Sequence, residues 1–538
     1  MYSGNSGSVK LRIHPLMVSF AFASTFVVIL CICFNPRWES NDDVAMSMVT
    51  HGYGLAAYSS PNLLFSNVLW GYLVRGLPTV HGILGYSLAT LAVATLVGTA
   101  ILYFLARMGV SYLTGLLVLI LVLSRPVLFP QFTINAGLLT CAAVLGWLAH
   151  VRNHCTFCLV ASCILAFLGY LVRSQEFALV LAVALPFLPW QLLGKHRKTQ
   201  VAFTLLACAI VGALLFDQWS NSGPEWSYYW KLNWARAPFT DFDAESRLLA
   251  QPDVMARHGL SRNDVELISS WFFVDRQIAD PARLRAIVME LGPTAMTTSF
   301  GSGLTAIASL SRPELFPLLV SAVGLLALTF RRRLLMSWVL CLGGLFAMGF
   351  VGRPGILRVY IPLLVLLVIV PVAFKPSRSG FGRIAAVSLL AIAGFANADL
   401  LIREAHVSDR MVAEAQMSHF IARDSIVMWG SSFPYEFMFP LIGTNSVARS
   451  LKMFGLGVST FAPYSIARAE EEIGKGLIAR LQSADGILIA ADKQLLKLLG
   501  TYCAEHYGTQ MNTTVAYESN LWTVYNARCN VPGGPPSG

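Results

Sequence analysis

The sequence predicts a polytopic α-helical membrane protein that carries a small α/β domain outside the membrane. Three observations predict this fold class. Of the 538 residues, 55% are hydrophobic and only 13% are charged, whereas a soluble globular chain carries about 25% charged residues. Apolar windows without a charged residue follow one another from residue 15 to residue 398. Beyond them, strand-like and helix-like segments alternate, as in a small α/β domain.

Eleven such windows predict about eleven transmembrane helices. About 20 apolar residues cross a bilayer, and flanking residues complete the shorter windows. The first window is too long for a cleavable signal peptide and is followed by many more, so it predicts a membrane anchor. The windows cover residues 15–36, 76–106, 108–124, 126–151, 153–172, 177–194, 199–216, 315–330, 334–352, 359–374 and 384–398.

Basic residues predict the orientation of these helices. With a cytoplasmic N-terminus, the inside loops hold thirteen lysines and arginines and the short outside segments hold six. This distribution follows the rule that positive charge stays inside. It also explains the net charge of +10 without a nucleic-acid partner. The outside loops are then residues 35–78 and 217–312.

The chain divides into two predicted domains and a tail. Residues 1–400 form a transmembrane domain, and residues 401–530 form an extracytoplasmic α/β domain. The Pro/Gly/Ser-rich residues 531–538 are predicted to be disordered.

The elements expected outside the membrane are short. Residues 63–74 predict a helix at the membrane interface, and residues 243–290 carry charges at the spacing of short amphipathic helices. The C-terminal region predicts a strand, a helix, a second strand, a second helix and a hairpin, over residues 425–429, 465–483, 486–491, 493–507 and 513–525.

Two pairs of cysteines are candidates for a metal site or a disulfide bond. Cys155 and Cys158 form a CxxC motif, but no second pair or histidine cluster completes a zinc site, so packing in an apolar environment is favoured. Cys503 and Cys529 are the two cysteines of the external C-terminal region. An oxidising compartment would allow them to pair, although the sequence does not give their separation.

Adjacent carboxylates, Asp42 and Asp43, follow the first predicted span. Ionisable groups at the membrane edge are costly and are usually retained for function. A carboxylate there serves as a general base for a hydroxyl group, or helps to position a divalent cation such as Mg²⁺ or Mn²⁺. The structural alternative is a solvated loop, or a helix capped by Asn41 or by one of the two aspartates.

Four arginines of the outside segments are candidate ligands of a donor phosphate. The planar guanidinium group forms paired hydrogen bonds with phosphate oxygens. The alternative is that these side chains extend to lipid headgroups. The four are Arg173, Arg236, Arg353 and Arg358.

An aromatic cluster in the second outside loop is a candidate substrate-binding segment. Trp230, Asn233 and Trp234 belong to a run in which aromatic, basic and amide side chains alternate. Such side chains can stack on a sugar ring or cover a prenyl chain. The alternative is anchoring at the membrane interface, where Trp and Tyr are enriched.

Taken together, an acidic pair in the first outside loop, a multi-span core and a C-terminal external α/β domain resemble the GT-C class of glycosyltransferases. This class includes protein O-mannosyltransferases and the bacterial aminoarabinose transferases of lipid A. The likeness covers nearly the whole chain at the level of architecture, while the local motifs are short. It implies an integral protein of a bacterial inner (plasma) membrane that transfers a sugar from a polyprenyl-phosphate donor to an envelope glycan, lipid or protein on the non-cytoplasmic face.

The resemblance also implies roles for the acidic pair. Asp42 corresponds to the catalytic base and Asp43 to the second acid, and this chain has Asp where many relatives have Glu. A single displacement without a covalent intermediate would invert the anomeric centre. The C-terminal domain is expected to help recognise the acceptor.

Two other functions remain as alternatives. A polysaccharide polymerase or ligase also has many spans and a large external loop, and would depend on loop arginines without the acidic pair. A transporter or flippase of lipid-linked sugars would place charges near the middle of the bilayer, often in repeated halves. The nearly charge-free spans and the lack of a repeat in this sequence disfavour transport.

Overall fold

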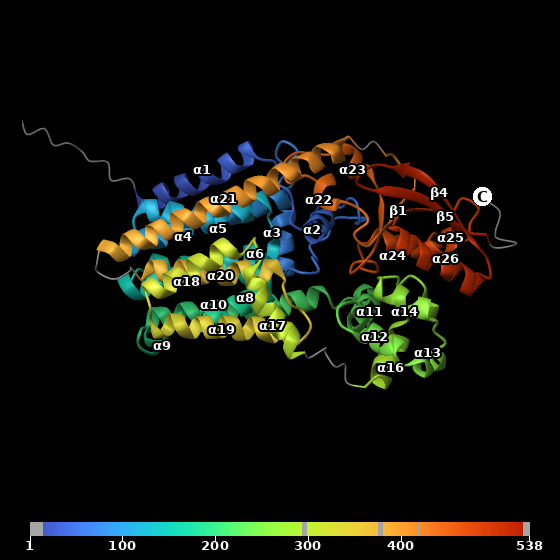
Figure 1. Cartoon of the computed structure of the whole chain (residues 1–538), viewed down its shortest axis with the longest axis horizontal. Helices are drawn as coiled ribbons and strands as arrows, with labels where there is room; N and C mark the ends of the chain where they lie inside the picture. The colour runs from blue at the N-terminus through green and yellow to red at the C-terminus, as the bar shows by residue number, and fades with distance from the viewer. Residues whose placement is uncertain (1–13, 293–298, 375–379, 418–419, 423, 531–538) are drawn as a thin grey trace, which may run out of the picture.

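The protein contains two bodies that lie along its long axis (Figure 1). One is a bundle of long helices, and the other combines short helices with a five-stranded sheet. This computed structural model describes residues 14–292, 299–374, 380–417, 420–422 and 424–530. The predicted disordered tail therefore lies outside the described residues.

Six helices of the bundle are long and apolar enough to cross a membrane. A seventh span results if α17 (Phe300–Ala308) and α18 (Phe316–Leu328), which meet at a bend of 90°, count as one. These helices indicate a membrane protein. Within the described residues, the six are α1 (Pro15–Cys33), α4 (Gly85–Arg107), α6 (Phe132–Asn153), α10 (Arg197–Ser220), α19 (Arg332–Phe350) and α21 (Gly380–Gln416).

Shorter apolar helices occupy the remaining predicted windows. They are α5 (Tyr112–Leu128), α7 (Thr156–Val172), α8 (Ser174–Val183) and α20 (Leu357–Ala373). A helix of 17 residues such as α5 rises about 26 Å, less than the ~30 Å of a bilayer core. The structure therefore supports six or seven candidate spans and does not confirm eleven.

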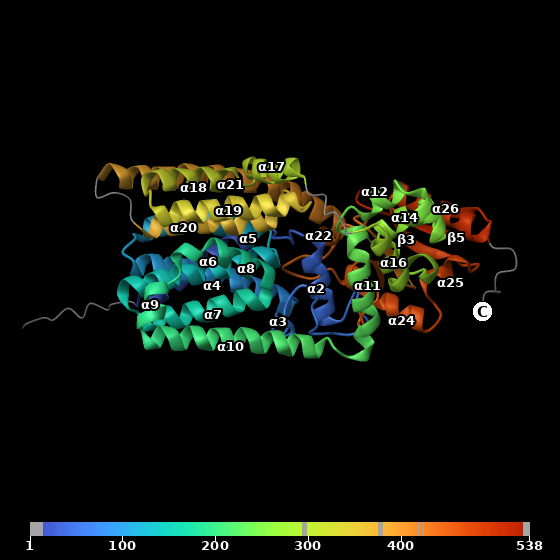
Figure 2. The same cartoon turned by 90° about the horizontal axis from the view of Figure 1, so that it is seen from below.

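The centre of the bundle is formed by α6 and α20, whose side chains are buried along most of their length. Both helices are apolar on all sides, as expected of a buried helix. Figure 2 shows α6 between α10 at one edge of the bundle and α18 at the other. Short connections complete the bundle: η1 (Leu185–Phe187), α9 (Trp190–Lys195) and η2 (Ser309–Ser311).

The first outside loop contains two helices, α2 (Asn41–His51) and α3 (Val68–Arg75). α3 lies within the segment predicted to form an interfacial helix, apart from its last residue. Asp42 and Asp43 occupy the first turn of α2, after the N-cap residue Ser40. The acidic pair thus begins a helix, as in the structural alternative, although the cap position is taken by Ser40 and not by Asn41 or an aspartate.

The sheet of the second body has the strand order β2-β1-β3-β5-β4. β1 pairs in parallel with β2 and β3, whereas β5 is antiparallel to β3 and β4. The prediction of two buried strands and a hairpin is confirmed. The strands are β1 (Ile426–Trp429), β2 (Met453–Leu456), β3 (Ile487–Ala490), β4 (Met511–Glu518) and β5 (Thr523–Cys529).

Two predictions for this region are wrong in detail. β2 was not predicted, because it has only four residues and includes Gly455. The single helix expected over 465–483 is two short helices, α24 (Ile466–Glu472) and α25 (Leu477–Leu481). Gly474 adopts a positive φ of 74° between them, which ends a right-handed helix. The other helices are α22 (Tyr435–Met438), α23 (Ser446–Ser450) and α26 (Lys493–Tyr507).

The second outside loop forms short helices, as predicted, and they cover one face of the sheet. Alternate residues of β1, Val427 and Trp429, share a buried core with this segment and with α26. The other face of β1, with Ile426 and Met428, belongs to the core that continues into the bundle. The helices are α11 (Pro224–Thr240), α12 (Ala244–Leu249), α13 (Pro252–Arg257), α14 (Arg262–Ser269), α15 (Arg276–Ala279) and α16 (Pro281–Glu290).

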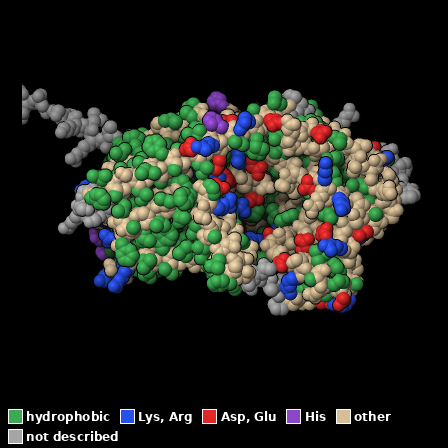
Figure 3. Space-filling model, in the orientation of Figure 1, with side chains coloured by type: hydrophobic (Ala, Val, Ile, Leu, Met, Phe, Trp, Pro, Cys, Tyr) green, Lys and Arg blue, Asp and Glu red, His purple; other side chains and the backbone are tan. Residues whose placement is uncertain are grey.

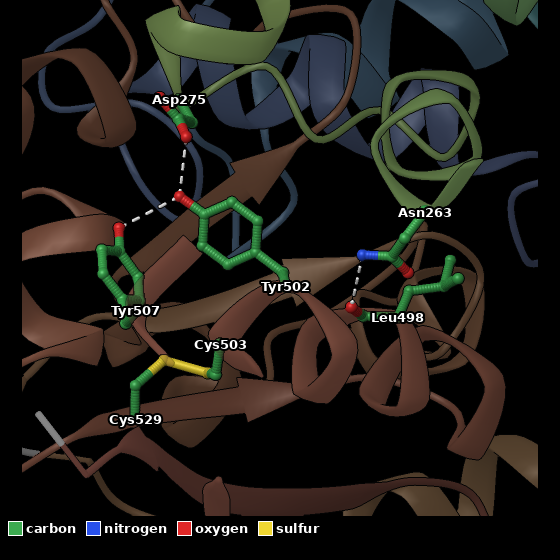
Figure 4. The surroundings of a disulfide bond; sticks show 7 residues. All are labelled: Asn263, Asp275, Leu498, Tyr502, Cys503, Tyr507 and Cys529. Atoms are coloured by element: carbon green, nitrogen blue, oxygen red, sulfur yellow. Dashed lines mark hydrogen bonds between the residues drawn. A yellow bond between two sulfur atoms is a disulfide. The ribbon is translucent and has the colours of Figure 1, made fainter. Parts of the chain in front are cut away.

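Hydrogen bonds hold the helices of the second outside loop against α26, and a disulfide bond holds α26 against the sheet (Figure 4). Cys503 of α26 is bonded to Cys529 of β5. Asn263 donates a hydrogen bond to the Leu498 carbonyl at 3.1 Å, and the Tyr502 hydroxyl donates to Asp275 at 2.7 Å. The second outside loop and the C-terminal region therefore form one folded unit, although more than a hundred residues separate them in the sequence.

The two bodies are joined at two further places. α21 is 37 residues long and runs from the bundle toward the sheet (Figure 1), so the predicted domain boundary near residue 400 falls inside one helix. The first outside loop also binds the free edge of β2. The Gly54 carbonyl accepts a hydrogen bond from the Met453 amide at 3.0 Å, and the Leu55 carbonyl accepts one from the Ile466 amide at 3.0 Å.

Candidate functional site

A cavity of about 530 Å³ lies between one end of the bundle and the sheet-containing body. Figure 3 shows a recess at this junction with basic and acidic side chains around it, between an apolar surface and a polar one. Four arginines and two aspartates line the cavity, so it carries an excess of two positive charges. All four arginines proposed from the sequence are among them: Arg173, Arg236, Arg353 and Arg358.

Asp42 is the acidic residue of the predicted pair that lines the cavity. Its place in the first turn of α2 puts the carboxylate at the positive end of the helix dipole. Asp42 Oδ2 accepts a hydrogen bond from Arg358 Nη1 at 2.8 Å. Arg358 belongs to the first turn of α20, so this ion pair joins the first outside loop to the bundle.

Asp43 points the other way and is fully buried. Its carboxyl group accepts hydrogen bonds from the Tyr86 hydroxyl at 3.1 Å, the Phe132 amide at 3.0 Å and the Ser40 hydroxyl at 3.1 Å. Burial, reinforced by the charge of Asp42, raises the pKa of Asp43 from its ordinary value of 3.8 to about 8. The two aspartates therefore differ: Asp42 faces the cavity, and Asp43 holds the loop on the bundle.

Arg173 is the cavity arginine with the most open hydrogen-bonding capacity. Its guanidinium lies 4.8 Å from the ring centre of Phe132 and 5.8 Å from that of Phe65. No described residue accepts a hydrogen bond or forms an ion pair with its side chain. Because guanidinium carries five N–H donors, Arg173 presents an open site for an anion.

Arg236 and Arg353 share a carboxylate that the sequence analysis did not select, Asp241. Its two oxygens lie 3.2 Å from Arg236 Nη1 and 3.2 Å from Arg353 Nη2. Arg236 is buried, which lowers its pKa, and it also donates to Thr240 at 2.7 Å and to Asn233 at 2.5 Å. The Arg236 guanidinium is thus largely satisfied within the protein, whereas Arg353 remains half-exposed.

The aromatic cluster predicted to bind substrate lies beside the cavity. Trp230 stacks on Trp226 and donates a hydrogen bond to the Asn221 carbonyl at 3.2 Å, so it supports the corner between α10 and α11. Trp234 is 72% exposed. Asn233 does not line the cavity, but its side-chain oxygen accepts a hydrogen bond from Arg236, which does. Neither tryptophan lines the cavity.

The tryptophan that does line the cavity is Trp271, which follows α14. Its amide donates to the Ile268 carbonyl and the next amide, of Phe272, donates to the Leu267 carbonyl. This pair of bonds is the Schellman helix ending, in which the residue with positive φ is usually glycine. Trp271 has φ of 71°, a conformation that costs a bulky residue about 1 to 3 kcal/mol.

The sheet contributes the opposite wall of the cavity. Residues at and beyond the carboxyl ends of the parallel strands β1 and β2 line it: Met428, Gly430, Gly455, Leu456, Gly457, Val458 and Ser459. In open α/β sheets this end of the strands is the usual place for a ligand. Thr460 fixes the loop after β2, because its hydroxyl accepts a hydrogen bond from the Gly457 amide at 2.9 Å and lies within hydrogen-bonding distance of the Gly457 and Gly455 carbonyls.

The residues around Asp42 do not fit a divalent cation. Asp42 already pairs with Arg358, and Asp43 is directed toward Tyr86 and Phe132, whereas Mg²⁺ requires an octahedron of oxygen ligands. Asp264, Glu505 and His506 form the one group of three metal-ligating side chains in the described part of the chain. They lie between α14 and α26, and Asp264 is occupied by hydrogen bonds to His506 and the Ser261 amide.

Asp241 and Trp271 are the site residues that the sequence analysis missed. Neither stands at the end of an apolar window, and the contacts that bring them to the cavity come from the fold. Comparisons with known proteins assign no family, since no family model matches the chain, and no curated protein or solved structure matches it either.

Proposed function

We propose that the protein is a GT-C-type membrane glycosyltransferase that moves a sugar from a polyprenyl-phosphate donor to a cell-envelope acceptor. One observation carries this proposal: Asp42 and four arginines from separate parts of the chain line a single cavity at one end of an apolar helical bundle. A lipid-linked donor can leave its prenyl chain in the membrane while its phosphate reaches this cavity.

In the proposed reaction, Asp42 is the general base. A hydroxyl group is a poor nucleophile at neutral pH, and a carboxylate within hydrogen-bonding distance takes its proton during attack. The acceptor oxygen forms a bond to the anomeric carbon as the bond from that carbon to the phosphate oxygen breaks. The phosphate leaves with the bonding electrons, and the anomeric centre is inverted.

The arginines supply the charge that the leaving group needs. The lipid phosphate gains negative charge as the glycosidic bond breaks, and fixed cations at that position stabilise the transition state. Arg173, with its open donors, and Arg358, beside the base, are the proposed phosphate ligands. Arg353 is a third, while Arg236 orients Asp241 and Arg353.

The sheet-containing body is proposed to recognise the acceptor. Its loops after β1 and β2 line the same cavity as Asp42, so an acceptor hydroxyl bound there would approach the base. On this proposal, the N-terminus is cytoplasmic and the sheet lies on the periplasmic side. The apolar helices support a location in the membrane.

A transfer assay tests the proposal. Purified full-length protein in detergent is supplied with radiolabelled polyprenyl-phosphate sugars and a crude envelope acceptor, and wild type is compared with Asp42→Asn. Asp485→Asn is the matched control, because Asp485 is exposed and lies outside the cavity. We expect transfer by wild type and by the control, and loss of transfer with retained donor binding in Asp42→Asn.

Other outcomes would count against it. Transfer that survives Asp42→Asn but is lost with Arg173→Gln would favour a polymerase or ligase that needs arginine but not the acid. Movement of a lipid-linked sugar across proteoliposomes without transfer would favour a flippase.

A further inference from the structure

We propose that Trp271 is the platform on which a sugar ring lies in the cavity, and hence a specificity-determining residue. That the ligand is a sugar rests on the proposed function. The position of the platform rests on the geometry of Trp271 itself, which the glycosyltransferase proposal does not require.

The helix ending alone does not explain a tryptophan at position 271. The two hydrogen bonds that close the turn use backbone groups only, and glycine would form them without the strain of φ 71°. The turn is also fixed from outside, since Trp429 Nε1 donates to the Ser270 carbonyl at 2.6 Å. Backbone strain of this kind persists where the surrounding structure imposes it, and often at a functional site.

The indole is held on one side by charge. The Arg236 guanidinium lies 4.3 Å from the ring centre, and Phe273 meets the ring edge-on at 6.0 Å. Arg236 is itself fixed by Asp241, Thr240 and Asn233. The indole therefore has a fixed orientation, while no described residue accepts a hydrogen bond from its Nε1 group.

The cavity around the indole matches the two sides of a sugar ring. The electron-rich face of the indole attracts the positively polarised C–H groups on the apolar face of a pyranose. Asp241, which also lines the cavity and pairs with the Arg236 that lies on the indole, offers carboxylate oxygens to the ring hydroxyls. Among the residues found to line the cavity, Trp271 is the sole tryptophan.

Saturation-transfer NMR with simple sugars tests the platform without requiring transfer. The probes are the methyl glycosides of glucose, galactose, mannose and N-acetylglucosamine, added to full-length protein in detergent. Wild type is compared with Trp271→Gly, Trp271→Phe and the control Trp219→Ala, whose exposed side chain lies outside the cavity. Thermal unfolding of each variant is measured in parallel.

We expect saturation of the ring protons of at least one glycoside in wild type, in Trp271→Phe and in the control, and its loss in Trp271→Gly. The Tm of Trp271→Gly should stay close to that of wild type, because glycine relieves the strained φ. Loss of signal accompanied by a large fall in Tm for both Trp271→Gly and Trp271→Phe would show a structural role and overturn the platform. Unchanged signal in Trp271→Gly, or no signal with any glycoside, would also overturn it.

Steady-state kinetics then show whether the sugar on the platform belongs to the donor or to the acceptor. If the platform holds the donor sugar, Trp271→Gly raises the donor KM about tenfold and leaves the acceptor KM unchanged, and the reverse holds for an acceptor sugar. Transfer with both KM values unchanged in Trp271→Gly would refute the platform alone. Glycoside binding that depends on Trp271, in a protein that transfers no sugar, would refute the proposed function alone.

Discussion

Arg358 Nη1 lies 2.8 Å from Asp42 Oδ2, joining two residues that are 316 positions apart in the chain. The contact places a guanidinium group directly beside the proposed base, at the point where the bundle meets the first outside loop. A phosphate that binds Arg358 would therefore lie within reach of the acceptor hydroxyl that Asp42 activates.

Arg358→Gln should lower kcat about 10² to 10³-fold, the loss expected when one preorganised donor to a developing charge is removed. Arg358→Lys should recover part of the activity, since it restores the charge but not the planar fork. The measurement is transfer of radiolabelled sugar at saturating donor. Arg410→Gln, on an exposed face of α21, serves as the control. Full activity in Arg358→Gln would remove this residue from the mechanism.

Arg173→Gln should mainly weaken ligand binding, whereas Arg236→Gln should mainly lower the stability of the fold. Arg173 has no hydrogen-bond acceptor among the described residues, so its replacement should leave Tm nearly unchanged and weaken binding of a short-chain polyprenyl phosphate about tenfold. Arg236 is buried against Asp241, and its loss should lower the free energy of unfolding by about 2 to 4 kcal/mol.

Calorimetric binding and thermal unfolding of both variants distinguish the two roles. Arg410→Gln is again the matched control. A stability loss in Arg173→Gln as large as that in Arg236→Gln would contradict the open anion site.

Asp43 should make the protein less stable as the pH rises. Its folded-state pKa of about 8 lies above the ordinary value of 3.8, so the folded protein holds a proton that the unfolded chain has lost. The stabilisation from this proton is complete below pH 4 and is lost progressively up to about pH 8, by at most about 1.4 kcal/mol per pH unit.

Asp43→Asn should remove this dependence, because the amide keeps the shape of the protonated carboxyl group and can still accept from Tyr86 and Phe132. Tm measured between pH 4 and pH 9 for wild type and Asp43→Asn gives the difference. Asp485→Asn controls for the loss of one carboxylate. Parallel pH profiles for wild type and Asp43→Asn would contradict the assignment.

Removal of the Cys503–Cys529 disulfide should destabilise the sheet-containing body. The bond closes a loop of 26 residues, for which the chain-entropy relation gives about 3.5 kcal/mol. Limited proteolysis of the Cys503→Ser/Cys529→Ser variant should cut within this body at a lower protease concentration than in wild type, while the bundle stays intact. Cys208→Ser, at an exposed free cysteine of α10, should cleave as wild type does.

The helices of the bundle and the cavity arginines could be predicted from the sequence because both are local signals. A charge-free apolar window predicts a helix by itself. Arg173, Arg353 and Arg358 stand near the ends of such windows, and Arg236 follows the aromatic run of the second outside loop. The number of spans could not be predicted in the same way. The charge-free stretch around α8 contains Pro186, and the helix ends after 10 residues, which hydropathy alone does not register.

Trp271 and Asp241 could not be predicted because their positions depend on contacts between distant segments. The aromatic run of α11 drew attention to Trp230 and Trp234, but the helix turns Arg236 toward the cavity and leaves Trp234 exposed. β2 was missed for a related reason. Its four residues form a strand because β1 pairs with one edge and the first outside loop binds the other.

The hydrogen bonds that join the first outside loop to β2 and to the start of α24 have a consequence for the order of synthesis. Gly54 and Leu55 leave the ribosome early, whereas their partners Met453 and Ile466 follow about 400 residues later. At about 5 to 20 residues per second, the loop that carries Asp42 waits about 20 to 80 s for the surface that completes it. A nascent chain is therefore unable to close the cavity. The cavity is complete only when residues 428–459, which form part of its lining, have been made.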